Sequence, residues 1–144
     1  MDKRLLAKPF LKWAGGKTQL LEEVASRLPQ QIKETGRIAS YVEPFVGGGA
    51  FFFYLRNMYT IEEAHLIDIN RDLIVAYKVV QQEPEELIER LQQIESTYLP
   101  MDSQGRKEYY YKIRQLYNGQ KENFPYERYS KNWLERASYL IFLN

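Results

Sequence analysis

The sequence predicts the α/β fold class, with one βαβ unit in residues 1–70 and a mostly helical subdomain in residues 71–144. Two observations lead to this prediction. Before residue 70, short apolar segments alternate with a glycine-rich loop and a helical stretch in the order strand, loop, helix, strand. After residue 70, apolar side chains recur at helical spacing. Two strands are too few for a stable sheet of this class, so we expect an incomplete sheet.

The first part should begin with an amphipathic helix over residues 17–28, which ends at Pro29. We expect a short strand over residues 41–45, which leads into a glycine loop, and then a helix over residues 51–57. A second strand is expected over residues 65–69, where the chain is apolar enough to lie inside a parallel sheet.

The second part should contain four helices. The first is marked by Leu73, Ile74, Tyr77 and Val80. Pro84 suits the first turn of the next helix. We expect a third helix between Arg106 and Asn118, ended by Gly119, and a fourth that Ser130 can cap.

Composition excludes several classes of chemistry. The 144 residues, 44% of them apolar and 27% charged, have the balance of a globular protein of about one domain. There is no cysteine and a single histidine, His65, which excludes disulfides, thiol catalysis and metal sites built from several histidines. No apolar run is long enough for a membrane span and the first residues do not resemble a signal peptide, so we expect a cytoplasmic protein.

The net charge of +1 conceals a pattern along the chain. Residues 71–102 have 3 basic and 7 acidic side chains, whereas residues 103–136 have 8 basic and 4 acidic ones together with many tyrosines. Basic side chains interleaved with aromatic ones are typical of nucleic-acid surfaces. An aromatic helical core with a solvated basic face explains the same composition, and composition alone favours that alternative.

The segment Glu43-Pro44-Phe45-Val46-Gly47-Gly48-Gly49-Ala50 is a glycine loop between a strand and a helix. Asp68 follows 21 residues after Gly47, at the end of the second strand, where a carboxylate can bind both hydroxyls of a ribose. This pairing favours an adenosine-containing ligand, but Phe52 replaces the third glycine of the dinucleotide motif and disfavours NAD. Alternatively, the glycines only form a turn and Asp68 caps the next helix.

A second glycine segment, Lys12-Trp13-Ala14-Gly15-Gly16-Lys17-Thr18, ends like a phosphate-binding loop. Its opening glycine is missing because position 11 is leucine, so only half of that motif is present. Backbone amides and Lys17 at the mouth of the following helix could instead hold a carboxylate. Alternatively, Trp13 is a plain core residue.

Together, these segments resemble the opening of the Dam-type adenine-specific DNA methyltransferases. The ordered motifs are Phe10-Leu11-Lys12-Trp13-Ala14-Gly15-Gly16-Lys17, Glu43-Pro44-Phe45-Val46-Gly47-Gly48-Gly49 and Asp68-Ile69-Asn70, followed by Tyr110-Tyr111-Lys112-Ile113-Arg114, Tyr117-Asn118 and Phe142-Leu143-Asn144. The resemblance implies an incomplete Rossmann-like S-adenosylmethionine-dependent methyltransferase fold. It also implies transfer of the methyl group of S-adenosyl-L-methionine to the exocyclic amino group of adenine in double-stranded DNA.

The resemblance also assigns roles to individual residues. The cofactor-binding set that it implies is Trp13, Ala14, Gly15, Lys17, Phe45, Gly47, Gly49, Asp68 and Ile69. Asp68 and Ile69 match the positions that contact the cofactor's ribose and adenine, and Glu43 is a candidate partner for its sulfonium charge. Residues 1–70 would then be the N-terminal part of the cofactor-binding catalytic domain, and residues 71–144 the helical start of the DNA target-recognition domain. A restriction endonuclease is an expected functional partner, and an exposed sheet edge or apolar C-terminus could support self-association.

The reaction centre of the family is an Asp-Pro-Pro-Tyr motif that holds the flipped adenine. No two prolines are adjacent in these 144 residues, so the motif is absent and no catalytic or metal-binding residue is assigned. We therefore expect a truncated, catalytically incomplete fragment. Two alternatives of other classes stay open: a nucleotide-phosphate-binding enzyme that uses Gly16-Lys17-Thr18, and a non-catalytic helical DNA-binding module.

These 144 residues by themselves should transfer no methyl group to DNA, because they lack the polar groups that hold the target amine. The measurement is incubation with tritiated S-adenosylmethionine and DNA free of adenine methylation, followed by counting of the recovered DNA. Clear incorporation would contradict the assignment of the reaction centre to a motif that this chain lacks.

Overall fold

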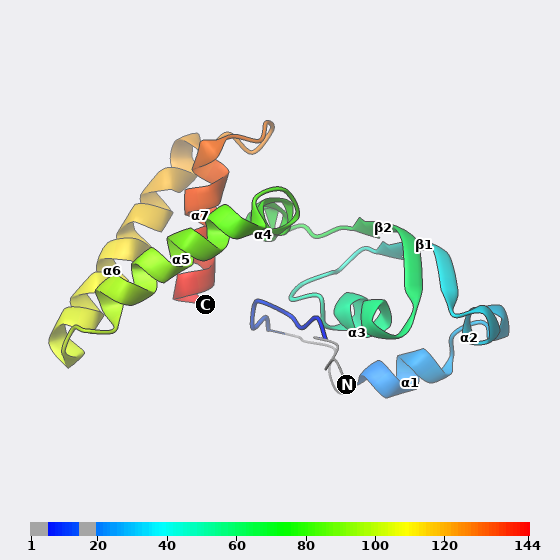
Figure 1. Cartoon of the computed structure of the whole chain (residues 1–144). Coiled ribbons are helices and arrows are strands. Elements are labelled where there is room, and N and C mark those ends of the chain that lie inside the picture. Colours follow the sequence, from blue (N-terminus) through cyan, green and yellow to red (C-terminus); the bar gives the residue numbers. More distant parts are fainter. Residues whose placement is uncertain (1–5, 15–19) are drawn as a thin grey trace. The chain divides into compact units, whose positions relative to one another are not determined.

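The computed structural model of the protein describes residues 6–14 and 20–144. The chain divides into two compact units, with the break between Ile69 and Asn70. The first unit is a mixed helix and strand structure, and the second is helical (Figure 1). The expected α/β class with a parallel strand pair is confirmed.

The first unit is built around β1 (Arg37–Glu43), α3 (Ala50–Met58) and β2 (Thr60–Leu66). The two strands are parallel, with Arg37 opposite Thr60 and Glu43 opposite Leu66, and α3 connects them (Figure 1). This is the predicted βαβ unit. Because the strands are parallel, their carboxyl ends meet at one edge of the sheet.

Both strands begin earlier than the sequence predicted. β1 starts directly after Gly36, whose φ of +68° ends the preceding helix and turns the chain into the strand. It ends before Pro44, which has no N–H to donate to a ladder. β2 lies mostly over polar, exposed residues, so its apolar pattern marks only its end. The predicted strand over residues 65–69 is therefore wrong at both bounds.

The predicted helix over residues 17–28 is shorter in the described part of the chain, where α1 spans Leu21–Ser26 and is followed by α2, Gln30–Thr35. Residues 17–19 lie outside the described residues. The sequence did not predict α2, a six-residue polar helix with no buried residue. Its polar composition left no apolar periodicity to detect.

The second unit contains the four predicted helices. They are α4 (Arg71–Gln82), α5 (Pro84–Tyr98), α6 (Ser103–Gln120) and α7 (Lys131–Leu143), with a 3₁₀ turn, η2 (Lys121–Asn123), after α6. α7 packs against the other three helices. The buried apolar side chains of this unit are Leu73, Val75, Ala76, Val79, Leu87, Ile94, Ile113, Trp133, Ala137 and Tyr139.

Two of the expected helix ends differ from the structure. Gly119 does not end α6, which continues to Gln120 and into η2. Glycine costs only about 1 kcal/mol in a helix, so packing can override its preference. Ser130 does precede α7, but its side chain makes no capping bond, and its backbone oxygen accepts from the Trp133 N–H instead.

A buried ion pair joins the first and last helices of this unit. The Arg136 side chain on α7 is 1% exposed, and its Nε and Nη2 donate to the two oxygens of Asp72 on α4 at 2.6 and 2.9 Å. The remaining nitrogen, Nη1, donates to the Tyr117 backbone oxygen at 2.8 Å. The hydroxyls of Tyr117 and Tyr126 also donate to Asp72, at 2.8 and 2.7 Å. Four segments of the unit therefore meet at one carboxylate.

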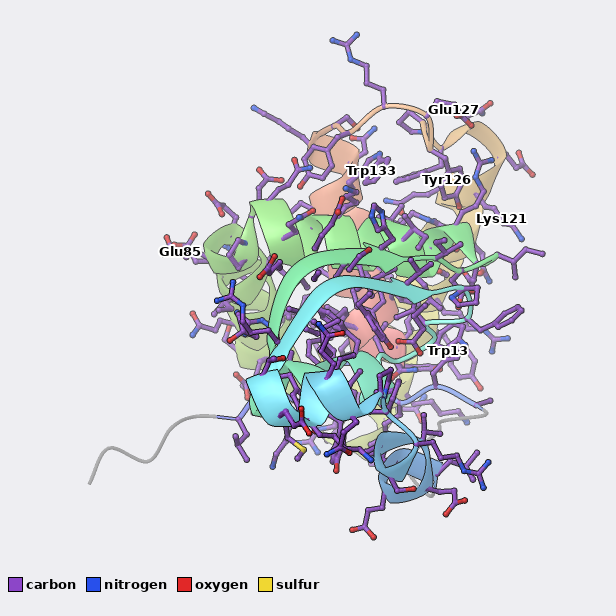
Figure 2. All side chains as sticks on the ribbon, turned by 90° about the vertical axis from the view of Figure 1, so that its right-hand side faces the viewer. Trp13, Glu85, Lys121, Tyr126, Glu127 and Trp133 are labelled. Carbon is purple, nitrogen blue, oxygen red and sulfur yellow. The ribbon has the colours of Figure 1, made fainter. Side chains whose placement is uncertain are left out.

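Aromatic rings enclose the guanidinium of this pair. Its carbon lies 4.1 Å from the ring centre of Tyr117 and 4.9 Å from that of Phe124. The Phe124 ring contacts the rings of both Tyr126 and Trp133, and Figure 2 shows these two side chains close together. Cation–π contact stabilises the guanidinium itself, and exclusion of water strengthens its attraction to the carboxylate.

Asp72 stays charged in this environment. Burial alone would raise the pKa of its carboxyl group, but the hydrogen bonds from Arg136, Tyr126 and Tyr117 outweigh burial and hold the pKa below its ordinary value of 3.8. Because this folded-state pKa lies below the unfolded value, the pair stabilises the fold above pH 3.8. That contribution is lost as the pH falls through the lower folded value.

Asp72→Asn should destabilise the second unit by about 3–5 kcal/mol at pH 7, because it leaves the Arg136 charge buried without a counter-charge. Urea unfolding followed by circular dichroism measures this change. The variant should also lack the part of the acid destabilisation that comes from protonation of Asp72. As a control, Glu127→Gln breaks the exposed pair with Arg71 and should cost less than about 1 kcal/mol. Equal urea midpoints for Asp72→Asn and the wild type would contradict the importance of the pair.

Candidate functional site

The glycine loop lies beside the segment that follows β2. The Ile67 N–H donates to the Glu43 oxygen at 2.8 Å, and the Val46 N–H donates to the Ile67 oxygen at 3.0 Å. Backbone pairing therefore continues past the ends of both strands. Residues 44–49 and residues 67–69 consequently meet at the carboxyl edge of the parallel sheet, where α/β folds place their ligands.

Asp68 contacts the glycine loop directly. The Gly47 N–H donates to Asp68 Oδ2 at 3.0 Å, so the structure brings together two residues that are 21 positions apart in the sequence. The alternative role of Asp68 as a helix cap is wrong, because Asn70 is the N-cap of α4. Asn70 Oδ1 accepts from the N–H groups of Asp72 and Leu73, at 3.0 and 3.4 Å.

Two of the three glycines have backbone conformations that other residues rarely adopt. Gly47 has a φ of +50°, and Gly49, the buried N-cap of α3, has a φ of +78°. These angles lie in the left-handed region, where a Cβ atom is disfavoured. The loop therefore needs glycine at both positions to make its turn, whatever else it binds.

The remaining glycine is explained by the N-terminal segment. A Cβ atom on Gly48 would lie 2.8 Å from the backbone oxygen of Leu11, and one on Gly47 would lie 3.3 Å from Trp13 Cδ1. Leu11 is 4% exposed, so it is a core residue of this unit. Residues 11–13 thus pack on the glycine loop. This contact was not predicted from the sequence, although adjacent glycines are a signal of close approach by another chain segment.

A buried carboxylate lies at the base of the loop. Glu43, the last residue of β1, is 6% exposed, and its Oε2 accepts a hydrogen bond of 2.6 Å from the Tyr41 hydroxyl. Burial of Tyr41 is the main reason that the pKa of its hydroxyl is raised above the ordinary value, and the hydrogen bond to Glu43 raises it further. Tyr41 therefore stays protonated and donates to Glu43, which helps to compensate for burial of the carboxyl group.

The other predicted cofactor-binding residues lie at different places around this edge. Phe45 is 75% exposed and Ile69 is 97% exposed, so both present apolar surface to solvent next to the loop and Asp68. Ala14 is also exposed. Gly15 and Lys17, like the whole Gly16-Lys17-Thr18 segment, lie outside the described residues.

Within residues 6–14 and 20–144, no three acidic or histidine side chains are grouped so that they could hold a metal ion. The helices of these same ranges include none that is both long and apolar enough to cross a membrane.

Comparison with known protein families decides the assignment. The family described as D12 class N6 adenine-specific DNA methyltransferase matches residues 13–144. The chain belongs to this family. The matched range includes β1, the glycine loop, β2, Asp68 and the whole helical unit. D12 membership therefore rests on nearly the entire chain and not on one motif.

Individual relatives agree with the D12 assignment. The chain is 44% identical over 137 residues to a protein of Methanocaldococcus jannaschii named Type II methyltransferase M.MjaIII, a match that covers 95% of this chain and 45% of the relative. It is 34% identical over 125 residues to the DNA adenine methylase of Haemophilus influenzae, covering 87% of this chain and 38% of the relative. The chain thus spans less than half the length of these relatives.

In this D12 chain, Gly48→Ala should loosen the first unit, because the new methyl group would press against the Leu11 backbone. Overpacking of this kind costs about 1–3 kcal/mol. Hydrogen exchange read by mass spectrometry should show faster exchange in β1, α3 and residues 6–14. Gly119→Ala is the matched control, since a Cβ there meets nothing within 4 Å and should slightly stabilise α6. Unchanged protection around the loop in Gly48→Ala would contradict the packing argument.

Proposed function

We propose that this chain supplies the S-adenosylmethionine-binding part of a site-specific DNA methyltransferase that acts on the exocyclic amino group of adenine. The main support from the structure is the bond from the Gly47 N–H to Asp68, which places a carboxylate against a left-handed glycine loop. This loop lies at the carboxyl edge of two parallel strands, the usual ligand position of α/β folds. Membership of the D12 family supports the same reaction.

The residues at this edge suit the chemistry of S-adenosylmethionine. A carboxylate such as Asp68 accepts hydrogen bonds from a ribose diol, and the exposed Ile69 beside it offers apolar surface to a purine ring. The Glu43 carboxylate suits a nearby sulfonium charge. When bound, S-adenosylmethionine supplies an activated methyl group. The role of the chain is to hold and orient the ribose and base through Asp68 and Ile69.

The glycine loop and the N-terminal motif complete the proposed site. Gly47 and Gly49 leave the loop backbone free of side chains, and Phe45 adds an exposed ring. Trp13 contacts the loop from the N-terminal side. The roles of Ala14, Gly15 and Lys17 in binding the cofactor rest on the family resemblance. Within this proposal, β1 and β2 are neighbouring strands of a larger Rossmann-like sheet.

The second unit is proposed to be the helical start of the DNA target-recognition domain, with double-stranded DNA as its partner. The excess of basic residues in the 103–136 stretch supports contact with phosphates. A restriction endonuclease as functional partner is proposed from the family resemblance alone. The exposed Val42 on β1 is consistent with self-association through the sheet.

Calorimetric titration with S-adenosylmethionine tests the cofactor proposal. The wild-type chain should bind, and Asp68→Asn should bind about 10-fold to 100-fold more weakly, since it loses hydrogen bonds to a charged acceptor. Asparagine still offers an oxygen to the Gly47 N–H, so the loop should stay in place. Asp68→Ala removes both the acceptor for the ribose and the acceptor for the Gly47 N–H, and it should bind no better than Asp68→Asn. Glu62→Gln, which removes a carboxylate elsewhere on β2, is the charge-matched control and should bind as the wild type does.

Three results, from this titration and from parallel titrations with ATP plus magnesium and with DNA, would contradict the proposal. Equal affinities for Asp68→Asn and the wild type would overturn the ribose contact. Binding of ATP with magnesium, but not of S-adenosylmethionine, would favour the nucleotide-phosphate enzyme. Salt-sensitive binding of DNA without affinity for S-adenosylmethionine would favour a DNA-binding module.

A further inference from the structure

The side chain of Asn57 binds both backbone groups of a residue 50 positions earlier. Asn57 lies near the end of α3. Its Oδ1 accepts from the Ala7 N–H at 2.9 Å, and its Nδ2 donates to the Ala7 oxygen at 2.8 Å. A side-chain amide that bonds both groups of one residue imitates the pairing of an adjacent strand. It fixes both the position and the direction of the backbone at Ala7.

A second α3 side chain holds the same segment one turn earlier. The Phe53 ring meets the Phe10 ring edge-on, with centres 6.3 Å apart. Phe53 and Asn57 are four positions apart, so they lie on the same face of the helix. Residues 7 and 10 are therefore attached to one face of α3, directly before Leu11 enters the core.

The attached segment leads to the glycine loop. The backbone oxygen of Leu11 lies where a side chain on Gly48 would have to be. Two residues later, Trp13 lies against Gly47. Gly47 in turn donates to Asp68. A continuous series of contacts thus runs from Asn57 through residues 7–13 to the loop and its carboxylate.

We propose that Asn57 is a positioning residue for the S-adenosylmethionine site. It holds residues 6–14 in place, so that Trp13 covers the glycine loop before a ligand arrives. This inference rests on the proposed function. Without the two bonds to Ala7, the segment would have to be ordered when the ligand binds, and only the fraction of molecules in which it is ordered would bind well.

The position of Trp13 can be measured independently of any ligand. The chain has two tryptophans, so in a Trp133→Phe background Trp13 is the only one. Asn57→Ala in this background should shift the Trp13 emission to longer wavelength and make it more accessible to acrylamide. Asn132→Ala, at an exposed helical asparagine of the second unit, is the matched control and should change neither property.

Two further variants separate the lost bonds from a general loss of structure. Asn57→Asp has the same size but cannot donate to the Ala7 oxygen, so its Trp13 emission should resemble that of Asn57→Ala. Ala7→Pro changes no residue of α3 and removes the N–H that donates to Asn57 Oδ1. It should reproduce the emission shift while the circular dichroism spectrum stays that of the wild type.

Binding completes the test. The affinity for S-adenosylmethionine should fall about tenfold in Asn57→Ala and in Ala7→Pro, the effect expected from the loss of one or two neutral hydrogen bonds. It should stay unchanged in Asn132→Ala. An unchanged Trp13 emission in Asn57→Ala would overturn the positioning role, and so would an emission shift without a loss of affinity. A wild-type chain that binds no S-adenosylmethionine would overturn the proposed function itself, whereas the emission measurements test the position of Trp13 without any ligand.

Discussion

The hydrogen bond from Gly47 to Asp68 is the contact on which the proposed site depends. Parallel pairing of β1 and β2 brings the ends of both strands to one edge, but it leaves the loops after them unconnected. The backbone bond from Val46 to Ile67 extends the pairing, and the Gly47–Asp68 bond then fixes a side chain at the end of it. A carboxylate held by a backbone amide points in one direction, which is what recognition of a ribose needs.

The glycines of the loop satisfy structural needs before any ligand is considered. Gly47 and Gly49 make the turn, and Gly48 makes room for the Leu11 backbone. Three glycines in this loop are therefore not evidence of a ligand by themselves. What favours a ligand is the combination of a held carboxylate with two largely exposed apolar side chains, Phe45 and Ile69, at the same edge. The structural and functional roles of the loop are compatible, because a fixed loop is a prepared binding surface.

The elements that the sequence predicted well are those in which buried apolar side chains recur at a regular spacing along the chain. The four helices of the second unit were predictable because apolar side chains at helical spacing are buried there, as at Leu73. β2 was misplaced because its side chains are mostly exposed and polar. The Asn57–Ala7 contact and the Asp72–Arg136 pair could not be predicted, since they join residues 50 and 64 positions apart through single polar side chains. Periodicity contains no information about such pairs.

The buried pair also changes how the basic composition of the second unit should be understood. Arg136 is one of the eight cations counted in residues 103–136, yet its charge is used entirely inside the fold. The hydroxyls of Tyr117 and Tyr126 are likewise bound to Asp72. The side chains left for a nucleic acid are the exposed ones, and on α6 three of these, Lys107, Tyr111 and Arg114, recur at helical spacing on one face. Two cations and a ring on a single helix face suit phosphates and bases. Support for DNA as partner therefore rests on this exposed face of α6, since the aromatic network around Arg136 is structural.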